Sequence, residues 1–202
     1  EKISSSGLDH IFKGQLDTAG ITTEDSSKKF KFIHLNGAHV PYIYDKEMNI
    51  INEWDGTYEQ STQATLFGAM DYVEQLRESG AYDNTTIIVM SDHGFNGSLA
   101  QSGDATWMRQ CAMLLVKGRN EHHDTMQISQ APISFEDLQE AYVRLLDGQQ
   151  SDSVFDWKEG DVRERRFLRY SFLDDSHMQE YMQTGYASDM DTMILTGREF
   201  NR

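Results

Sequence analysis

The sequence has little cysteine, little proline and no long apolar run. Its 202 residues include one cysteine, Cys111, and two prolines. A single cysteine excludes an intrachain disulfide and is most simply a small buried core residue. No stretch reaches the roughly 18 to 20 apolar residues that cross a bilayer, and the first residues have no basic-then-apolar signal pattern. With few prolines and no long linker, residues 1–202 are predicted to form a single domain.

Basic residues are also scarce. The chain has 18 Lys and Arg against 33 Asp and Glu, which gives a formal net charge of −15. Such an excess of carboxylates repels phosphate backbones and anionic lipid, so nucleic acid and membrane surfaces are disfavoured as direct partners. An anionic substrate would therefore need a local cationic site or a bound metal.

Hydrophobic patterning predicts strands that alternate with helices. Residues 1–27 are rich in turn formers and predict a loop-rich entry with one short helix. Apolar spacing of three and four residues predicts amphipathic helices over 57–79 and 134–148. Apolar or alternating runs typical of strands occupy residues 28–35, 85–90, 111–118, 163–173, 178–187 and 191–200. This order predicts an α/β fold with a central, mostly parallel sheet flanked by helices and with antiparallel strands at its C-terminal edge.

The tetrapeptide Ser91-Asp92-His93-Gly94 follows the apolar run at 85–90. Ligands in open α/β sheets bind at the carboxyl ends of strands, and a tight turn at Gly94 can aim a carboxylate and an imidazole at one cation. Mixed oxygen and nitrogen ligands suit zinc or manganese better than calcium. The alternative is an ordinary turn in which Asp92 makes a local hydrogen bond to the backbone.

His39 lies in the loop HLNGAHVPY, residues 34–42, which follows the run at 28–35. Gly37 allows the backbone to turn and Pro41 stiffens the exit, so His39 is a candidate ligand-facing side chain, with a solvated loop imidazole as the alternative. A parallel βαβ unit places both strand ends on one side of the sheet. The predicted fold would thus bring His39 towards Asp92 and His93.

Together, HLNGAHVPY, the helix after it and IIVMSDHG at 87–94 resemble the C-terminal half of the sulfatase-like branch of the alkaline phosphatase superfamily. The nearest branch is the bacterial envelope phosphoglycerol and phosphoethanolamine transferases, including lipoteichoic acid synthases. The resemblance covers about residues 28–150 well. It implies that Asp92 and His93 bind a divalent metal, zinc or manganese before calcium or magnesium, and that His39 is a catalytic residue that contacts the substrate phosphate or a second metal. It also implies a phosphate- or sulfate-ester substrate such as a lipid head group, attachment to the membrane through segments upstream of this chain, and a location on the outer face of the cell membrane or in the periplasm.

The sequence departs from that family before the histidine loop. Members supply an acidic metal ligand and a hydroxyl or cysteine nucleophile well upstream, whereas 38 residues precede His39 here, and hydroxyls such as Thr22 and Thr23 follow no predicted strand. The chain is therefore expected to be the C-terminal portion of a larger catalytic domain, and inactive by itself. The alternative function is a non-catalytic sulfatase-like domain with a structural or interaction role in a membrane-anchored surface protein.

Overall fold

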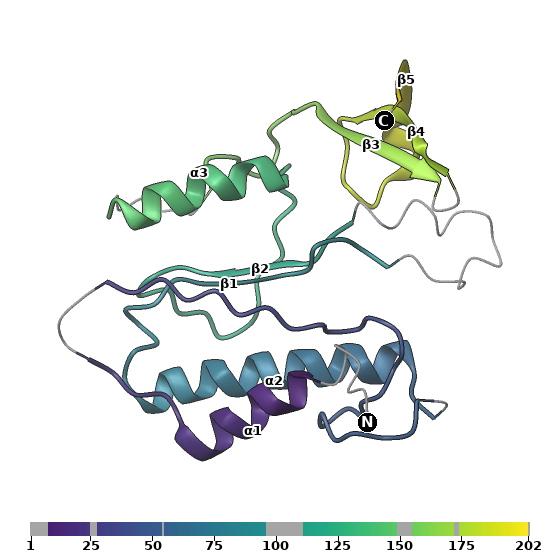
Figure 1. Ribbon diagram of the computed structural model, residues 1–202. Coiled ribbons are helices and arrows are strands. Elements are labelled where there is room, and N and C mark those ends of the chain that lie inside the picture. Colours follow the sequence, from purple (N-terminus) through teal and green to yellow (C-terminus); the bar gives the residue numbers. More distant parts are fainter. Residues whose placement is uncertain are drawn as a thin grey trace. The chain divides into compact units, whose positions relative to one another are not determined.

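The computed structural model has three α-helices and five strands in the part of the chain that it describes (Figure 1). The described residues are 8–24, 28–53, 55–95, 111–148, 155–171 and 174–201. The elements are α1 (Asp9–Ala19), α2 (Tyr58–Glu78), β1 (Ile87–Met90), β2 (Leu114–Lys117), α3 (Phe135–Leu146), β3 (Arg165–Ser171), β4 (Asp174–Gln183), a 3-10 turn at Met190–Thr192 and β5 (Met193–Asn201). None of the described helices is both long enough and apolar enough to cross a membrane.

The chain divides into two units. The first comprises Glu1–Thr86 and Arg119–Glu121, and the second comprises Ile87–Gly118 and His122–Arg202. The first unit therefore contains α1 and α2, and the second contains every named strand together with α3. This division does not test the expectation of a single domain, which stays a prediction.

The helix predicted over 57–79 is confirmed as α2. It begins at Thr57, whose Oγ1 accepts a hydrogen bond from Gln60 N at 3.2 Å while Gln60 Oε1 accepts one from Thr57 N at 3.0 Å. This reciprocal capping satisfies two amide groups that a helix start otherwise leaves unpaired. Gly80, at a φ of 75°, follows the helix end. A left-handed backbone is a common way to leave a helix, and glycine adopts it without strain.

The core of the first unit forms where the loop before α2 packs onto the helix. Tyr44, Met48 and Ala64 are almost fully buried in one cluster. A Cβ atom at Gly68 would lie 2.8 Å from Met48 Cε, so a larger residue there would move the end of the methionine side chain. The buried face of α2 thus holds the loop that follows the His39 segment.

The prediction of a central parallel sheet is wrong. Residues 28–35, which were expected to provide its first strand, are not a strand, and Phe32 is 79% exposed. Among the described strands every pairing is antiparallel, in one sheet of two strands and one of three. The apolar run at 28–35 has the pattern of a strand, but that pattern does not specify which strand it pairs with. Its three lysines, at 28, 29 and 31, are more typical of an exposed segment.

The strands predicted at 85–90 and 111–118 do form, as β1 and β2, but they pair antiparallel. Ile87 lies opposite Lys117 and Met90 opposite Leu114. The helix predicted over 134–148 is confirmed as α3, and its buried Leu138 and Ala141 form a cluster that includes Ile88 and Leu114. α3 therefore packs on one face of the two-stranded sheet, which accounts for the apolar side chains of Ile88 and Leu114 on that face.

The three C-terminal strands form an antiparallel meander, as predicted, in the order β3-β4-β5. It is a separate sheet and not the edge of a larger one. Phe167 on β3 stacks on Tyr181 on β4 with ring centroids 5.8 Å apart. The pairing of β4 with β5 shifts register between Gln179 and Tyr181, which places the buried Glu180 at a bulge.

Candidate functional site

The turn that follows β1 brings the side chains of Asp92 and His93 together. The turn starts from Ser91, whose N donates to Met113 O at 3.1 Å and whose Oγ accepts from Met113 N at 2.8 Å. Asp92 Oδ1 accepts a hydrogen bond from His93 N at 2.9 Å, and Asp92 Oδ2 lies 3.7 Å from His93 Nε2. Both contacts come from two consecutive residues, so the local turn alone sets the geometry of this pair.

The ring orientation of His93 leaves one nitrogen available. Its Nδ1 lies 2.6 Å from Gly94 O, and a carbonyl oxygen can only accept a hydrogen bond. Nδ1 must therefore carry the proton, and in the neutral ring Nε2 presents its lone pair on the side of Asp92. Metal-binding histidines are commonly oriented in this way, with the other ring nitrogen donating to a carbonyl group.

The donor set fits part of a divalent metal site. One carboxylate oxygen and one imidazole nitrogen are common ligands of zinc, and two ligands of a tetrahedral zinc ion lie roughly 3.4 Å apart. The observed 3.7 Å between Asp92 Oδ2 and His93 Nε2 is close to that spacing. The side chains are 87% and 40% exposed, so an ion can reach them from solvent. Within the described ranges, no group of three or more His, Cys, Asp or Glu could complete the set.

His39 lies in the first unit, in a loop that is anchored by a buried carboxylate. Asp9, at the start of α1, is 3% exposed, and its two oxygens accept hydrogen bonds from Asn36 N at 2.9 Å and Gly37 N at 2.8 Å. Gly37 has a φ of 62°, which explains glycine at this position. The next turn is closed by His39 N, which donates to Asn36 O at 3.3 Å. Asp9 was not among the residues predicted from the sequence.

The imidazole of His39 repeats the arrangement of His93. Its Nδ1 lies 2.6 Å from Val40 O, so Nδ1 is the protonated nitrogen and Nε2 is left for a ligand. The side chain is exposed. The expectation that His39 lies beside Asp92 and His93 stays a prediction: it rested on a parallel βαβ unit, whereas the described strands pair antiparallel, and the residues belong to different units.

The chain offers no activated nucleophile beside these residues in its described ranges. Cys111 is half-buried, its Sγ–H donates to Ala187 O at 2.9 Å, and burial raises the pKa of its thiol. A thiol with a raised pKa is a poor nucleophile at neutral pH. Thr22 and Thr23 are exposed loop residues that follow α1. No protein-family model, curated protein or solved structure matches this chain.

Proposed function

We propose that this chain carries part of the site of a metal-dependent phosphoryl- or sulfuryl-ester transferase or hydrolase, with Asp92 and His93 as metal ligands. The observation that carries the proposal is the Asp92–His93 pair itself. Its carboxylate and its free Nε2 face one another at 3.7 Å, while the carbonyl of Gly94 holds the imidazole ring. The resemblance of residues 34–42 and 87–94 to sulfatase-like enzymes adds the reaction class.

Each residue has a distinct role in this proposal. A bound dication would lower the pKa of a hydroxyl nucleophile and neutralise charge on the transferred group. Asp92 supplies negative charge to hold the cation, and His93 supplies a neutral nitrogen whose direction Gly94 fixes. His39, when doubly protonated, keeps its Nδ1–H on Val40 O and presents Nε2–H, the form that stabilises an oxyanion or protonates a departing oxygen.

The same proposal extends to substrate and setting. Zinc or manganese is the metal, and a phosphate or sulfate ester, such as a lipid head group, is the substrate. The metal suits a chain of net charge −15, because a cation at Asp92 offsets the repulsion that an anionic substrate would meet. Placement at the outer face of the cell membrane or in the periplasm rests on the sequence resemblance alone.

Calorimetric titration of the full chain with zinc and with manganese tests the proposal. Four-ligand structural zinc sites bind with about 10–16 kcal/mol, so two ligands should give one site with a dissociation constant on the order of 1–200 μM. The double variant Asp92→Ala with His93→Ala should lose this site. The matched control is His122→Ala with His123→Ala, which removes another adjacent, exposed histidine pair and should leave the affinity unchanged.

Two results would contradict the metal site. Zinc binding that survives in the Asp92 and His93 variant places the metal elsewhere, and zinc binding that disappears in the His122 and His123 control identifies a surface histidine site. No binding by the parent chain would favour the alternative, a non-catalytic structural or interaction domain. Because no activated nucleophile lies beside Asp92 and His93 in the described residues, the chain is expected not to turn over p-nitrophenyl phosphate or p-nitrophenyl sulfate, with or without metal.

A further inference from the structure

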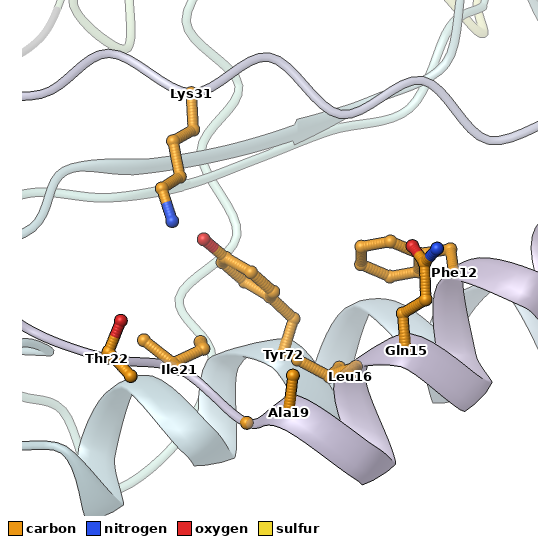
Figure 2. A pocket seen from close by; sticks show the side chains of 9 residues that line it. Phe12, Gln15, Leu16, Ala19, Ile21, Thr22, Lys31 and Tyr72 are labelled. Carbon is orange, nitrogen blue, oxygen red and sulfur yellow. The ribbon is translucent and has the colours of Figure 1, made fainter.

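The first unit contains a pocket that the proposed metal site does not use. It lies beside α1 and α2, under the segment that includes Lys31, and has a volume of about 240 Å³ (Figure 2). Its lining residues are Phe12, Gln15, Leu16, Ala19, Gly20, Ile21, Thr22, Lys31 and Tyr72. All of them belong to one unit, so the pocket is formed within a single body.

The floor of the pocket is apolar. Leu16 is 7% exposed, Phe12 and Ile21 are half-buried, and the rings of Phe12 and Tyr72 lie 6.3 Å apart in a tilted arrangement. Leu16 and Ile21 come from the end of α1 and the chain just after it, where Gly20 turns the backbone at a φ of 64°. An apolar ligand group bound here would contact aliphatic and aromatic carbon of the pocket floor on one side, while its other side would face water.

The mouth of the pocket carries polar groups. Figure 2 shows the ammonium group of Lys31 and the hydroxyl of Tyr72 pointing toward one another, with the Thr22 side chain nearby. Two other lysines of this unit form ion pairs: Lys13 with Asp17 and Asp71, and Lys29 with Glu24. In the part of the chain that the structure describes, no carboxylate lies within 4.0 Å of Lys31 Nζ, although the charge of Glu24 acts on it from farther away.

We propose that this pocket binds a small organic anion with an apolar tail. The anionic head would lie between Lys31 Nζ and the Tyr72 hydroxyl, and the tail would cover Phe12, Leu16 and Ile21. A volume of about 240 Å³ is smaller than the roughly 300–1,000 Å³ of typical small-molecule sites, so the pocket suits a small ligand of about eight non-hydrogen atoms. An ammonium group at the mouth of the pocket favours an anion in a chain whose net charge otherwise repels anions.

Hexanoate, which has eight non-hydrogen atoms, is a suitable probe. Its binding to the ¹⁵N-labelled full chain can be followed through backbone amide shifts, with hexan-1-ol as the tail-only control and acetate as the head-only control. A ligand this small should have a dissociation constant on the order of 1–10 mM and shift amides of residues 12–22, 31 and 72. Both controls should bind at least about threefold more weakly, because each lacks one of the two contacts.

Matched variants locate the head and the tail. Lys31→Gln should weaken hexanoate binding about three- to fivefold, the range of an exposed ion pair, and should leave hexan-1-ol binding unchanged. Lys28→Gln removes the same charge from the same exposed segment outside the pocket and should leave hexanoate binding unaltered. Ile21→Ala should weaken hexanoate and hexan-1-ol alike. None of these variants changes Asp92 or His93, so the result is independent of metal binding.

Four outcomes would overturn the proposal. Hexan-1-ol binding as tightly as hexanoate would remove the role of charge, and equal losses in Lys28→Gln and Lys31→Gln would indicate non-specific attraction. Absence of amide shifts up to about 50 mM hexanoate would exclude the site. Hexyl phosphate, which keeps the tail and carries more negative charge, should bind at least as tightly as hexanoate if an anionic head is recognised, and weaker binding would contradict that role of charge.

Discussion

Glu180 is a buried carboxylate on the central strand of the C-terminal sheet, with an exposed side-chain fraction of 8%. Two arginines reach it, with Arg166 Nη1 3.0 Å from Oε1 and Arg198 Nη1 3.2 Å from Oε2. The Thr196 hydroxyl donates to Oε1 at 3.0 Å. Burial opposes ionisation, but the hydroxyl and the two guanidinium groups together lower the pKa of Glu180 below its ordinary value.

This lowered pKa makes the stability of the sheet depend on pH. Above about pH 4.3, the pKa of a glutamate in the unfolded chain, the charged Glu180 carboxylate contributes fully to the free energy of unfolding. This contribution is lost as the pH falls through the lower pKa of Glu180 in the folded chain. Glu180→Gln should therefore reduce the free energy of unfolding at pH 7, and the difference from the parent should shrink below about pH 4. Urea unfolding followed by circular dichroism between pH 3 and pH 7 measures the loss of stability at pH 7 and how the difference from the parent changes with pH.

Glu164→Gln is the control for this prediction. Glu164 contacts the same arginine, with Arg166 Nη2 3.0 Å from its Oε2, but its side chain is 59% exposed. Exposed ion pairs contribute about 0–1 kcal/mol, so its loss should change the unfolding free energy little at any pH. An equal effect of the two substitutions, or a Glu180→Gln difference that does not shrink in acid, would mean that the ionised Glu180 carboxylate does not stabilise the sheet.

Residue-level interactions differ in how far the sequence predicts them. Asp92 and His93 are adjacent, so a tight turn at Gly94 was enough to predict that both could face one ion. Their polar atoms lie 3.7 Å apart, and their role as metal ligands stays a prediction. Asp9 and Gly37 are 28 positions apart, and no spacing rule connects an acidic residue in a first helical turn with a distant loop. Asp9, the carboxylate that anchors the His39 loop, could therefore not be identified from the sequence alone.

At the scale of single elements, the start of α3 depends on one carboxylate. Asp137 Oδ2 accepts from Ser134 N at 2.7 Å and from Arg163 Nη1 at 2.6 Å, and Oδ1 accepts from Trp157 Nε1 at 3.2 Å. Arg163 also stacks on Trp157, with its guanidinium carbon 4.6 Å from the ring centroid. This cluster ties the first turn of α3 to the chain that leads into β3.

Asp137→Asn should therefore destabilise the second unit. The amide can still accept from Ser134 N, but Arg163, whose side chain is 13% exposed, loses its half-buried charged partner and keeps only the exposed Glu136, which should cost about 1–2 kcal/mol of unfolding free energy. Glu136→Gln is the matched control, because Glu136 contacts Arg163 at 3.4 Å with a side chain that is 87% exposed. It should cost less than about 0.5 kcal/mol. Equal urea midpoints for the two variants would contradict this role of Asp137.

The sequence predicted elements better than it predicted their pairing. The two helices α2 and α3 were predicted closely because their apolar spacing, and the residues that begin and end them, act within a few positions. The runs at 85–90 and 111–118 were correctly predicted as strands, but strand direction depends on contacts between distant residues. The continuous apolar run Ile87–Met90 was interpreted as a buried parallel strand, but it pairs antiparallel, and α3 packs on one of its faces through Ile88.

At the scale of the whole molecule, the excess of acidic residues should dominate the response to salt. Even if every Lys and Arg were paired with one carboxylate, 15 carboxylates would remain in excess. Repulsion among them opposes the folded state, and raising the ionic strength from 0.01 M to 0.1 M shortens the screening length from about 30 Å to about 10 Å. The ion pairs weaken as well, but in the described residues those of Lys13 with Asp17, Lys29, Arg77, Arg144 and Arg166 with Glu164 each have at least one exposed partner, so each contributes little.

The melting temperature at pH 7.5 should therefore rise by a few degrees, equivalent to about 1 kcal/mol, when sodium chloride is increased from 0.01 M to 0.1 M. Differential scanning calorimetry of the full chain measures this shift. At pH 5, near the sequence isoelectric point of about 4.7, the same salt step should have a smaller effect, since the net charge of the chain is small there. The Asp92→Ala and His93→Ala double variant should respond as the parent does, because sodium acts by screening and not by binding at that turn. A melting temperature that falls with salt would show that the ion pairs, and not the excess charge, control the stability of this protein.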